Sequence, residues 1–375
     1  MSVIWLLSNI EVEPLAASAE PIRCLRLQLC HDIIHLSPTA NSMPAKLGQV
    51  MNIDSRSDVF DVIIIGGGPA GLTAALMLGR ACKRVLVCDT GKPRNQVAHA
   101  AYGFFSRDGI APAQLLQIGR EQLCPYDGVE IQVGEVVDAQ KLGDRFQVTL
   151  SDGNQFVSRK LLLATGMKDT LPPIDGFAEL WGGSVFHCPY CHGWEVRDQP
   201  LAIYGKGEVG FEMTLMLTGW SRDLVLCSDG SAELSHEQRQ RLLNWGVQIR
   251  EEKIARLEHK DGNLTGIVFT NNEVLPRRGI IIYPQSSQHS HLAAKLGCKL
   301  SNDDIVEVDE SKQTSIAGLS AVGDASSPYS HIALAVTSGT LAATFINRTL
   351  IEENLVEPDT VRGSKEVRLM VAQQH

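Results

Sequence analysis

The sequence predicts an α/β fold of two Rossmann-like units, the second inserted into the first. Three observations predict it. The pattern of buried strand, glycine-rich turn, helix and strand occurs twice along the chain. A group of short strand-like runs separates the two copies. A further strand and helix follow the second copy, and because one such unit is too small to complete a full sheet, this last segment is expected to return to the first unit.

The first 56 residues are expected to form an N-terminal extension outside the fold. The chain has 375 residues, enough for two or three compact units. Near its start, VIWLLSNI is short, has no basic residue before it and is followed by Glu11 and Glu13, which fits neither a secretory signal nor a transit peptide. Met51 stands just ahead of the first strand-like run, so a start codon placed too far upstream is one explanation. An ordered N-terminal arm is the alternative.

The first unit is expected at residues 57–173 and 280–350. FDVIII is a continuous, mostly β-branched run, typical of a strand buried on both faces of a parallel sheet. GGGPAG, the helical stretch LTAALMLGRACK and the strand RVLVCD follow it. Residues 129–164 instead carry three short strand-like runs separated by turn signals, which predicts a small antiparallel meander.

The second unit is expected at residues 174–279, after the linker LPPIDG. LAIYGKGEVGFEMTLMLTG and DLVLCSD repeat the strand, glycine turn, helix and strand. The chain is then expected to return to the first unit through IIIYP and a helix from about His331 to Asn347. Residues 351–375 are expected to form a C-terminal tail.

The first glycine turn has the spacing of a dinucleotide site. Gly66 permits the tight turn, Gly68 lets the backbone approach a pyrophosphate, and Gly71 allows close packing of helix and sheet. The helix N-terminus offers free N–H groups and positive partial charge to that pyrophosphate. Asp89, at the end of the next strand, can accept a hydrogen bond from a ribose hydroxyl. The first unit is therefore expected to be a three-layer (ββα) dinucleotide-binding domain. The second unit, which repeats the same pattern, is expected to have the same architecture.

The second glycine turn, with Gly205, Gly207 and Gly210, predicts a different ligand. Asp229 follows the next strand, at the position where the sugar is read. An enzyme that selects NADPH would favour arginines here for the 2′-phosphate, and CSDGSAELS supplies none. At about 4 Å, Asp229 would repel that phosphate by on the order of 1 to 4 kcal/mol per unit charge. NADPH is therefore disfavoured, and the site suits NADH or a second FAD, or is vestigial and binds nothing.

Cys188, Cys191 and His192 lie together in FHCPYCHGWE. Haem attachment requires export and a distal ligand, and no export signal is seen. A structural zinc site needs four ligands, and no second paired-cysteine motif completes one. A redox dithiol fits best, because a flavin can exchange two electrons with a disulfide. His192, whose unperturbed pKa is about 6.5, could take and return a thiol proton. The alternative is a histidine that only satisfies local backbone groups.

Composition excludes several classes of function. Hydrophobic residues make up 44% and charged residues 21%, as in soluble domains, and no apolar run approaches the roughly 18 residues that a membrane span needs. A formal net charge of −9 without a Lys/Arg block makes nucleic acid an unexpected partner. Nine cysteines, mostly scattered singly, indicate a reducing cytosol and a cytoplasmic protein.

The motifs in combination resemble the low-molecular-weight thioredoxin reductase family over roughly residues 58–350. They are VIIIGGGPAGLTAA, the ATG at residues 164–166, CPYC and AVGDASS. The resemblance implies a two-domain flavoprotein, usually a homodimer, with FAD on the split first domain and the cysteine pair on the inserted one. It also implies that Cys191 faces the flavin while Cys188 exchanges with the partner's sulfur.

The resemblance further implies that the ribityl chain and flavin ring meet Gly323, Asp324, Ile332 and Ala333. The predicted cofactor-binding set also includes Pro69, Ala70, Arg94, Asn95, Ala164, Thr165 and Gly166.

Two features depart from the familiar reductases. They have an aspartate where this chain has His192, which resembles the dithiol oxidases of disulfide natural-product pathways. The missing arginines at the second turn resemble branches that do not use pyridine nucleotides, including the diflavin-linked disulfide oxidoreductases, in which a second FAD takes the place of NADPH.

The leading hypothesis is an FAD-dependent disulfide oxidoreductase that acts on a thioredoxin-like protein or a small dithiol and is not driven by NADPH. Its electron donor would be a reduced flavin system, a ferredoxin-like protein or NADH. One alternative is a dithiol oxidase that passes electrons to oxygen. The other is a non-catalytic, flavin-binding redox sensor. No metal is expected in any of the three.

Overall fold

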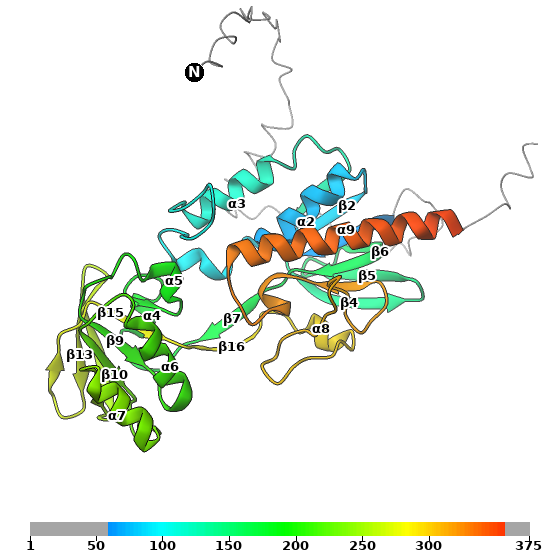
Figure 1. The fold of residues 1–375 in the computed structure, drawn as a ribbon. Helices are drawn as coiled ribbons and strands as arrows, with labels where there is room; N and C mark the ends of the chain where they lie inside the picture. Colours follow the sequence, from blue (N-terminus) through cyan, green and yellow to red (C-terminus); the bar gives the residue numbers. More distant parts are fainter. Residues whose placement is uncertain (1–58, 357–375) are drawn as a thin grey trace, which may run out of the picture. The chain divides into compact units, whose positions relative to one another are not determined.

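A computed structural model describes residues 59–356. Figure 1 shows two groups of strands with helices beside them. The extension expected at residues 1–56 lies outside the described residues, as does most of the expected C-terminal tail. Among the described helices, none is both long enough and apolar enough to cross a membrane.

The first sheet has seven strands in the order β3-β2-β1-β6-β5-β4, with β17 paired to β6. The strands β1, β2, β3, β6 and β17 run parallel, whereas β5 is antiparallel to both β4 and β6. Their bounds are β1 Val59–Ile65, β2 Val85–Asp89, β3 Val129–Val133, β4 Val136–Leu142, β5 Arg145–Leu150, β6 Gln155–Leu163 and β17 Leu319–Ala321.

The expected antiparallel meander is formed by β4, β5 and β6. The run VEIQVGEVV does not form one strand, because β3 ends at Val133 and pairs in parallel with β2. The chain turns at Gly134, where a Cβ would lie 2.8 Å from a methyl group of Leu150. One apolar run in the sequence therefore supplies strands to both parts of the sheet.

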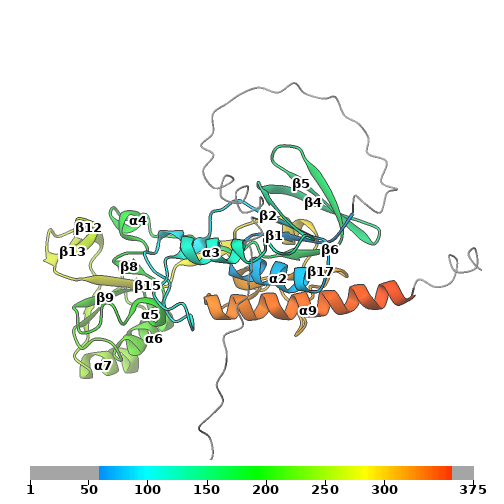
Figure 2. The ribbon, with the colours of Figure 1, turned by 90° about the horizontal axis from the view of Figure 1, so that it is seen from above.

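Alternate residues of β1 face two different cores, which explains its uninterrupted apolar run. Val62 and Ile64 pack with helices α2 (Pro69–Arg80) and α9 (Ile332–Val356). Ile63 packs on the opposite face, among residues of β4, β5 and β6. Figure 2 shows α2 and α9 together on one face of this sheet, with β4 and β5 toward the other. A strand buried on both faces needs no polar positions.

Helix α9 is longer than the sequence predicted. It was expected to end at about Asn347, but it continues to Val356. Glu353, near its end, forms ion pairs with Arg159 and Lys160 of β6. Because these partners lie almost 200 residues away in the sequence, local sequence patterns did not reveal the extra turns.

Four shorter helical elements belong to the chain on either side of the second sheet. Two precede that sheet and two follow it. Their bounds are η1 Arg94–Val97, α3 Pro112–Glu121, α8 Leu292–Lys295 and η2 Gly323–Ser326.

The second sheet has five parallel strands in the order β11-β10-β9-β15-β8. Four helices and a small antiparallel sheet, β12-β13-β14, accompany it. The strand bounds are β8 Val185–Phe186, β9 Leu201–Tyr204, β10 Leu224–Cys227, β11 Gln248–Arg250, β12 Ile254–Lys260, β13 Asn263–Phe269, β14 Val274–Leu275 and β15 Gly279–Ile282. The helices are α4 Phe177–Leu180, α5 Pro189–His192, α6 Gly207–Leu217 and α7 His236–Asn244.

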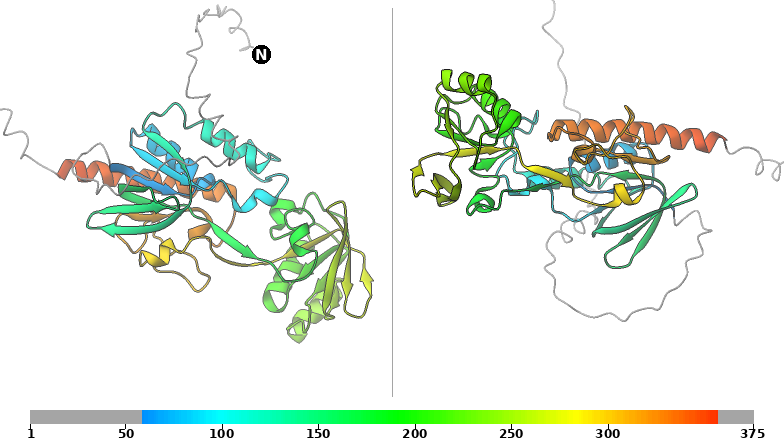
Figure 3. Two further views of the ribbon diagram at one scale, coloured as in Figure 1. Left: turned by 180° about the vertical axis from the view of Figure 1, so that it is seen from behind. Right: turned by 90° about the horizontal axis from the view of Figure 1, so that it is seen from below.

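Strand β15 differs from the expected boundary. The sequence assigned IIIYP to the segment that returns to the first unit, whereas β15 pairs with β9 and β8 in the second sheet. An apolar run of this kind can be buried in either parallel sheet, so its composition does not choose between them. The chain instead returns through β16 (Gln285–Gln288), which pairs with β7 (Met167–Thr170). Figure 3 shows this two-stranded connection from two further sides.

Candidate active site

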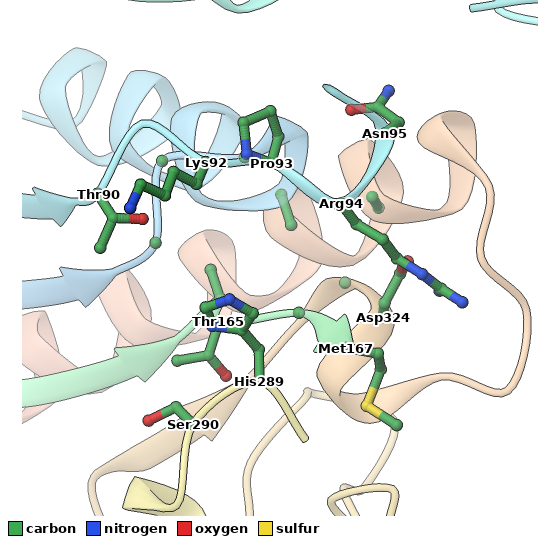
Figure 4. A pocket seen from close by; sticks show the side chains of 18 of the residues that line it. Thr90, Lys92, Pro93, Arg94, Asn95, Thr165, Met167, His289, Ser290 and Asp324 are labelled. Carbon is green, nitrogen blue, oxygen red and sulfur yellow. The ribbon is translucent and has the colours of Figure 1, made fainter. Parts of the chain in front are cut away.

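A cavity of about 550 Å³ lies where the parallel strands β1, β2 and β6 end. The turns after these strands form much of its wall, and η1, η2 and the start of α9 contribute as well. Figure 4 shows Arg94 reaching toward Asp324. The carboxyl ends of parallel strands are the usual place for a ligand in such sheets.

Most of the predicted residues of the first glycine turn and its surroundings line this cavity, while the others do not. The predicted residues that line it are Gly66, Gly68, Pro69, Ala70, Asp89, Arg94, Asn95, Ala164, Thr165, Gly166, His192, Gly323, Asp324 and Ile332. Those outside its lining are Gly71, Cys188, Cys191, Gly205, Gly207, Gly210, Asp229 and Ala333.

The glycines of the first turn have distinct steric roles. Gly66 has φ +108°, and a Cβ there would lie 2.2 Å from the carbonyl oxygen of Ala164. A Cβ on Gly71 would lie 1.9 Å from the carbonyl oxygen of Gly66, so Gly71 lets α2 pack tightly against β1. A Cβ on Gly68 would meet no protein atom within 4 Å. Since Gly68 lines the cavity and precedes the N-terminus of α2, it leaves room for a ligand's phosphates to approach the backbone.

Asp89 holds the first turn in place from the end of β2. Its Oδ1 accepts a hydrogen bond from the N–H of Gly67 at 3.0 Å, and its Oδ2 pairs with Arg120 at 3.0 Å. A carboxylate offers about four acceptor positions, so Asp89 can still accept from a ribose hydroxyl.

The residues of this cavity fit FAD. An open helix N-terminus, a glycine whose missing side chain leaves space, and a carboxylate at the end of β2 are groups that suit such a dinucleotide. Gly323 and Asp324 follow β17, and β1 and β6 lie between β2 and β17 in the sheet. In contrast, the described residues contain no group of three or more His, Cys, Asp or Glu placed to hold a metal ion.

Arg94 joins several elements at the cavity wall. Its Nε donates to Asp169 of β7 at 2.8 Å and its Nη1 donates to Asp324 of η2 at 2.9 Å. Its guanidinium also donates to the hydroxyls of Ser286 and Ser330. Arg94, which was predicted to bind the cofactor, lines the cavity, and its guanidinium also donates to these protein groups.

Asp169 was not predicted from the sequence. Its side chain is only 6% exposed. Burial alone would raise the pKa of this carboxyl, but hydrogen bonds from Arg94 and Ser286 hold it below the usual value. Asp169 therefore stays ionised next to the cavity. No local motif marks it, since its role depends on an arginine 75 positions earlier.

Cys188 and Cys191 form a disulfide at the start of the short helix α5. Cys188 is the N-cap, and its Sγ accepts a hydrogen bond from the N–H of Cys191 at 3.2 Å. Both cysteines are partly buried. The sulfurs lie outside the cavity lining, but the residues on either side of the pair, His187 and His192, both belong to it.

His192 sits between aromatic rings. Its imidazole stacks on Phe186 at 5.3 Å and meets Tyr102 edge-on at 6.3 Å. Its Nδ1 is buried and has no hydrogen-bond partner within residues 59–356. Burial lowers the pKa of His192 below its ordinary value, so the ring is neutral at pH 7 and can accept a proton.

His187 is a second imidazole that the sequence reasoning missed. It packs against Trp181 with ring centroids 5.7 Å apart. Burial and the nearby charge of Arg94 lower its pKa from 6.5 to about 4, against the opposing effect of Asp169. Its position directly before Cys188 was visible in FHCPYCHGWE and could have identified it as a candidate.

The second glycine turn has different surroundings. Gly207 opens α6, and its N–H donates to the carbonyl oxygen of Ala232 at 2.8 Å. Gly210 packs against Gly205, as the third glycine of such a turn should. Asp229 accepts a hydrogen bond from the N–H of Ile254 at 2.8 Å. The predicted residues of this turn are therefore together, but their polar groups already have partners in the protein.

Comparison with known proteins gives a consistent family. The model described as "Pyridine nucleotide-disulphide oxidoreductase" matches residues 60–340. A protein named "Thioredoxin reductase tcpT" from Claviceps purpurea is 31% identical over 313 residues, covering 80% of this chain and 97% of the relative.

Two solved structures have a similar fold. HlmI is 36% identical with a TM-score of 0.77, covering 82% of this chain and 97% of that one. A structure titled "Putative Thioredoxin Reductase TrxB" from Bacillus anthracis is 33% identical with a TM-score of 0.75, covering 79% and 99%.

Proposed function

Because the chain belongs to the pyridine nucleotide-disulphide oxidoreductases, and among them to the low-molecular-weight thioredoxin reductase-like enzymes, we propose that it moves two electrons between FAD and the Cys188–Cys191 pair. The observation that carries this proposal is a disulfide whose neighbours, His187 and His192, line the cavity of the first glycine turn. We further propose that the pair exchanges with a dithiol partner and that NADPH is not the electron donor.

The proposed domains follow the chain through its two connections. Residues 57–173 form the first part of the FAD-binding domain, which resumes after the second sheet. The inserted domain carries the cysteine pair and begins at about residue 174. The pairing of β15 with β9 and β8 supports a return after Ile282, at β16, rather than at residue 280.

The cysteine pair performs thiol–disulfide exchange in this proposal. FAD, when bound, supplies a two-electron donor or acceptor for the pair. Two electrons and two protons first reduce the Cys188–Cys191 disulfide. The Cys188 thiolate then attacks a partner disulfide, which forms a mixed disulfide and releases one partner thiol. Cys191 then attacks Cys188, restoring the internal disulfide and releasing the second partner thiol. The same steps in reverse oxidise a dithiol.

His192 would move the proton that this exchange requires. A thiol must lose its proton before its sulfur can attack. His192 directly follows Cys191, and its neutral imidazole has a buried Nδ1 without a partner in the described part of the chain. We therefore propose that His192 accepts a proton from one thiol and later returns it.

The proposal also names a thiol partner and an electron donor. Relatives named thioredoxin reductases support a thioredoxin-like partner, and a small dithiol fits the same chemistry. The donor would be a reduced flavin system, a ferredoxin-like protein or NADH. We also propose a homodimer in the cytoplasm. The cysteine pair and the family favour an enzyme over a non-catalytic sensor.

A dithiol oxidase is the second candidate, and the position of His192 favours it. In this direction the pair would oxidise a substrate dithiol to a disulfide, and FAD, when bound, would supply the route by which oxygen takes up the two electrons and two protons as hydrogen peroxide. Oxygen uptake with a dithiol substrate tests it. Uptake that matches disulfide formation would support the oxidase, whereas its absence would exclude that direction.

Substitution of the exchanging sulfur tests the main proposal. Cys188→Ser should lose turnover of a dithiol or disulfide substrate by at least about 10³-fold. The control is Cys82→Ser, since Cys82 is an exposed cysteine outside the site. Unchanged exchange in Cys188→Ser would refute the proposal. Rapid bleaching of the flavin by micromolar NADPH would refute the part that concerns the donor.

A further inference from the structure

The second glycine turn repeats the motif of the first, and a Cβ on Gly207 would meet only the carbonyl oxygen of Glu233, at 3.9 Å, but the backbone amide of Gly207 already has a partner. In the first turn, Gly68 faces the cavity, and a Cβ there would meet no protein atom within 4 Å. At the matching position of the second turn, the N–H of Gly207 donates to the carbonyl oxygen of Ala232 at 2.8 Å. This amide is one of the helix N-terminal donors that would otherwise bind a pyrophosphate.

Ala232 is held firmly in this place. Its side chain is fully buried, and its own N–H donates to Oε1 of Glu251 at 2.8 Å. The hydroxyl of Ser228 donates to the carbonyl oxygen of Gly230 at 2.6 Å, which fixes the preceding turn. The backbone at Asp229 and Glu233 adopts positive φ, an arrangement that persists only where surrounding contacts impose it.

Two carboxylates belong to the surroundings of the helix N-terminus at the second turn. Glu233 pairs with Lys206, the N-cap residue of α6. This pair is more than half exposed, so it adds little to stability. The pair carries no net charge, but it occupies the ammonium group of Lys206, while Glu208 adds a carboxylate to the first turn of α6. A bound pyrophosphate would have to compete with Glu233 for Lys206 and would lie near the Glu208 carboxylate.

The residue expected to read the ribose has protein partners as well, although its carboxylate, like that of Asp89, keeps spare acceptor positions. Asp229 accepts from the N–H of Ile254 and lies 3.8 Å from Lys253. The carboxylate also interacts with the hydroxyl of Tyr204, whose pKa is raised by burial and by Asp229. The carboxylate therefore serves to anchor the start of the segment that ends at Glu233.

We infer that residues 229–233 close the second glycine turn, so that the inserted domain binds no dinucleotide, whether NADPH, NADH or a second FAD. The Ala232 carbonyl and the Glu233 carboxylate take the place of the pyrophosphate. This disagrees with the pyridine nucleotide that the family name implies. It deepens the proposed function, on which it rests for one consequence: of the donors proposed above, NADH is excluded at this site, and electrons enter or leave the flavin without a nucleotide bound on the inserted domain.

Binding and amide exchange together test this inference without turnover. The FAD-loaded protein is titrated by calorimetry with NADPH, NADH and ADP-ribose, and hydrogen exchange is followed in a peptide that covers residues 205–211. We expect no saturable binding that alters this peptide, and a protected Gly207 amide in the free protein. Nucleotide binding that slows exchange in the peptide, or an unprotected Gly207 amide, would overturn the inference.

Two neighbouring acidic residues give a matched pair of variants. Glu251→Ala removes the acceptor of the Ala232 N–H and should speed exchange at Gly207. Glu252→Ala removes an equal charge that pairs with Arg250 instead, and should leave this exchange unchanged. Equal behaviour of the two variants would contradict the role of Ala232. These readouts are separate from dithiol turnover, so failure here and failure of the proposed function can be told apart.

Discussion

Two imidazoles flank the disulfide, and their surroundings give them different properties. His187 lies against Trp181 and near the charge of Arg94, and its pKa falls to about 4. His192 lies on Phe186, and its pKa is lowered by burial alone. Both rings are therefore neutral at pH 7. Only His192 directly follows a cysteine of the pair while keeping a buried nitrogen without a partner in the described chain.

Loss of the proposed base should slow exchange and alter its pH dependence. The neutral form of His192 is lost as the pH falls through its lowered pKa, so wild-type exchange should fall only in acid below about 6.5. His192→Gln should slow flavin reduction by a dithiol by about 10²- to 10⁴-fold and remove this acid limb. Stopped-flow measurement across pH checks both. His236→Gln, at an exposed histidine, is the control, and an unchanged acid limb in His192→Gln would contradict the role.

His187 should make stability depend on pH. Its pKa is lower in the folded protein than in the unfolded chain, so below pH 6.5 the unfolded chain gains a proton that the folded protein does not. Stability is therefore lost as the pH falls from 6.5 to about 4, by on the order of 1 to 3 kcal/mol. His187→Gln should show a smaller fall in thermal midpoint over this range. An equal fall in variant and wild type would show that His187 does not titrate in this way.

At the scale of elements, some glycines allow helices to pack closely, whereas Gly68 leaves room for a ligand. A Cβ on Gly71 would collide with the carbonyl oxygen of Gly66, and one on Gly339 of α9 would lie 2.2 Å from the carbonyl oxygen of Ala70. These two positions set how closely α2 approaches β1 and α9. Gly68 instead borders open space.

Alanine at two of these glycines should therefore have different effects, one on the stability of the protein and the other on its affinity for FAD. Gly339→Ala should lower stability by about 1 to 3 kcal/mol, because α2 and α9 must separate. Gly68→Ala should leave the thermal midpoint of the apoprotein almost unchanged but weaken FAD binding by at least about tenfold, or ~1.4 kcal/mol. Thermal melts and retained FAD after dialysis measure the two. Thr344→Ala on the exposed face of α9 is the control. Full FAD retention in Gly68→Ala would contradict its role.

At the scale of the whole molecule, Arg94 joins the two connecting strands, β7 and β16, to the wall of the cavity. It bonds to Asp169 of β7, Ser286 of β16 and Asp324 of η2. Asp324 is also a predicted contact of FAD. The same guanidinium therefore links the wall of the cofactor cavity with both segments that lead to the second sheet.

Removal of Arg94 should destabilise this connection. Arg94→Met leaves Asp169 buried without its main partner, at a cost of about 3 to 5 kcal/mol. Hydrogen exchange in β7 and β16 should become faster, and the thermal midpoint should fall. The double variant with Asp169→Asn should recover part of the loss, since no charge is then left buried. Arg197→Met removes an exposed arginine that lies over Trp194 and should leave both measurements unchanged. A single Arg94 variant with unaltered exchange would contradict the role.

The sequence by itself determined the two repeats of strand, glycine turn, helix and strand, and the paired cysteines with their histidine. These features follow from local rules of spacing, backbone freedom and burial, so neighbouring residues suffice to predict them. The tertiary structure decided which sheet receives β15, how far α9 continues through Glu353, and what Arg94 binds. It also decided that the N–H of Gly207 meets the carbonyl of Ala232. Each of these depends on contacts between residues far apart in the chain, whose spacing leaves no periodic signal in the sequence.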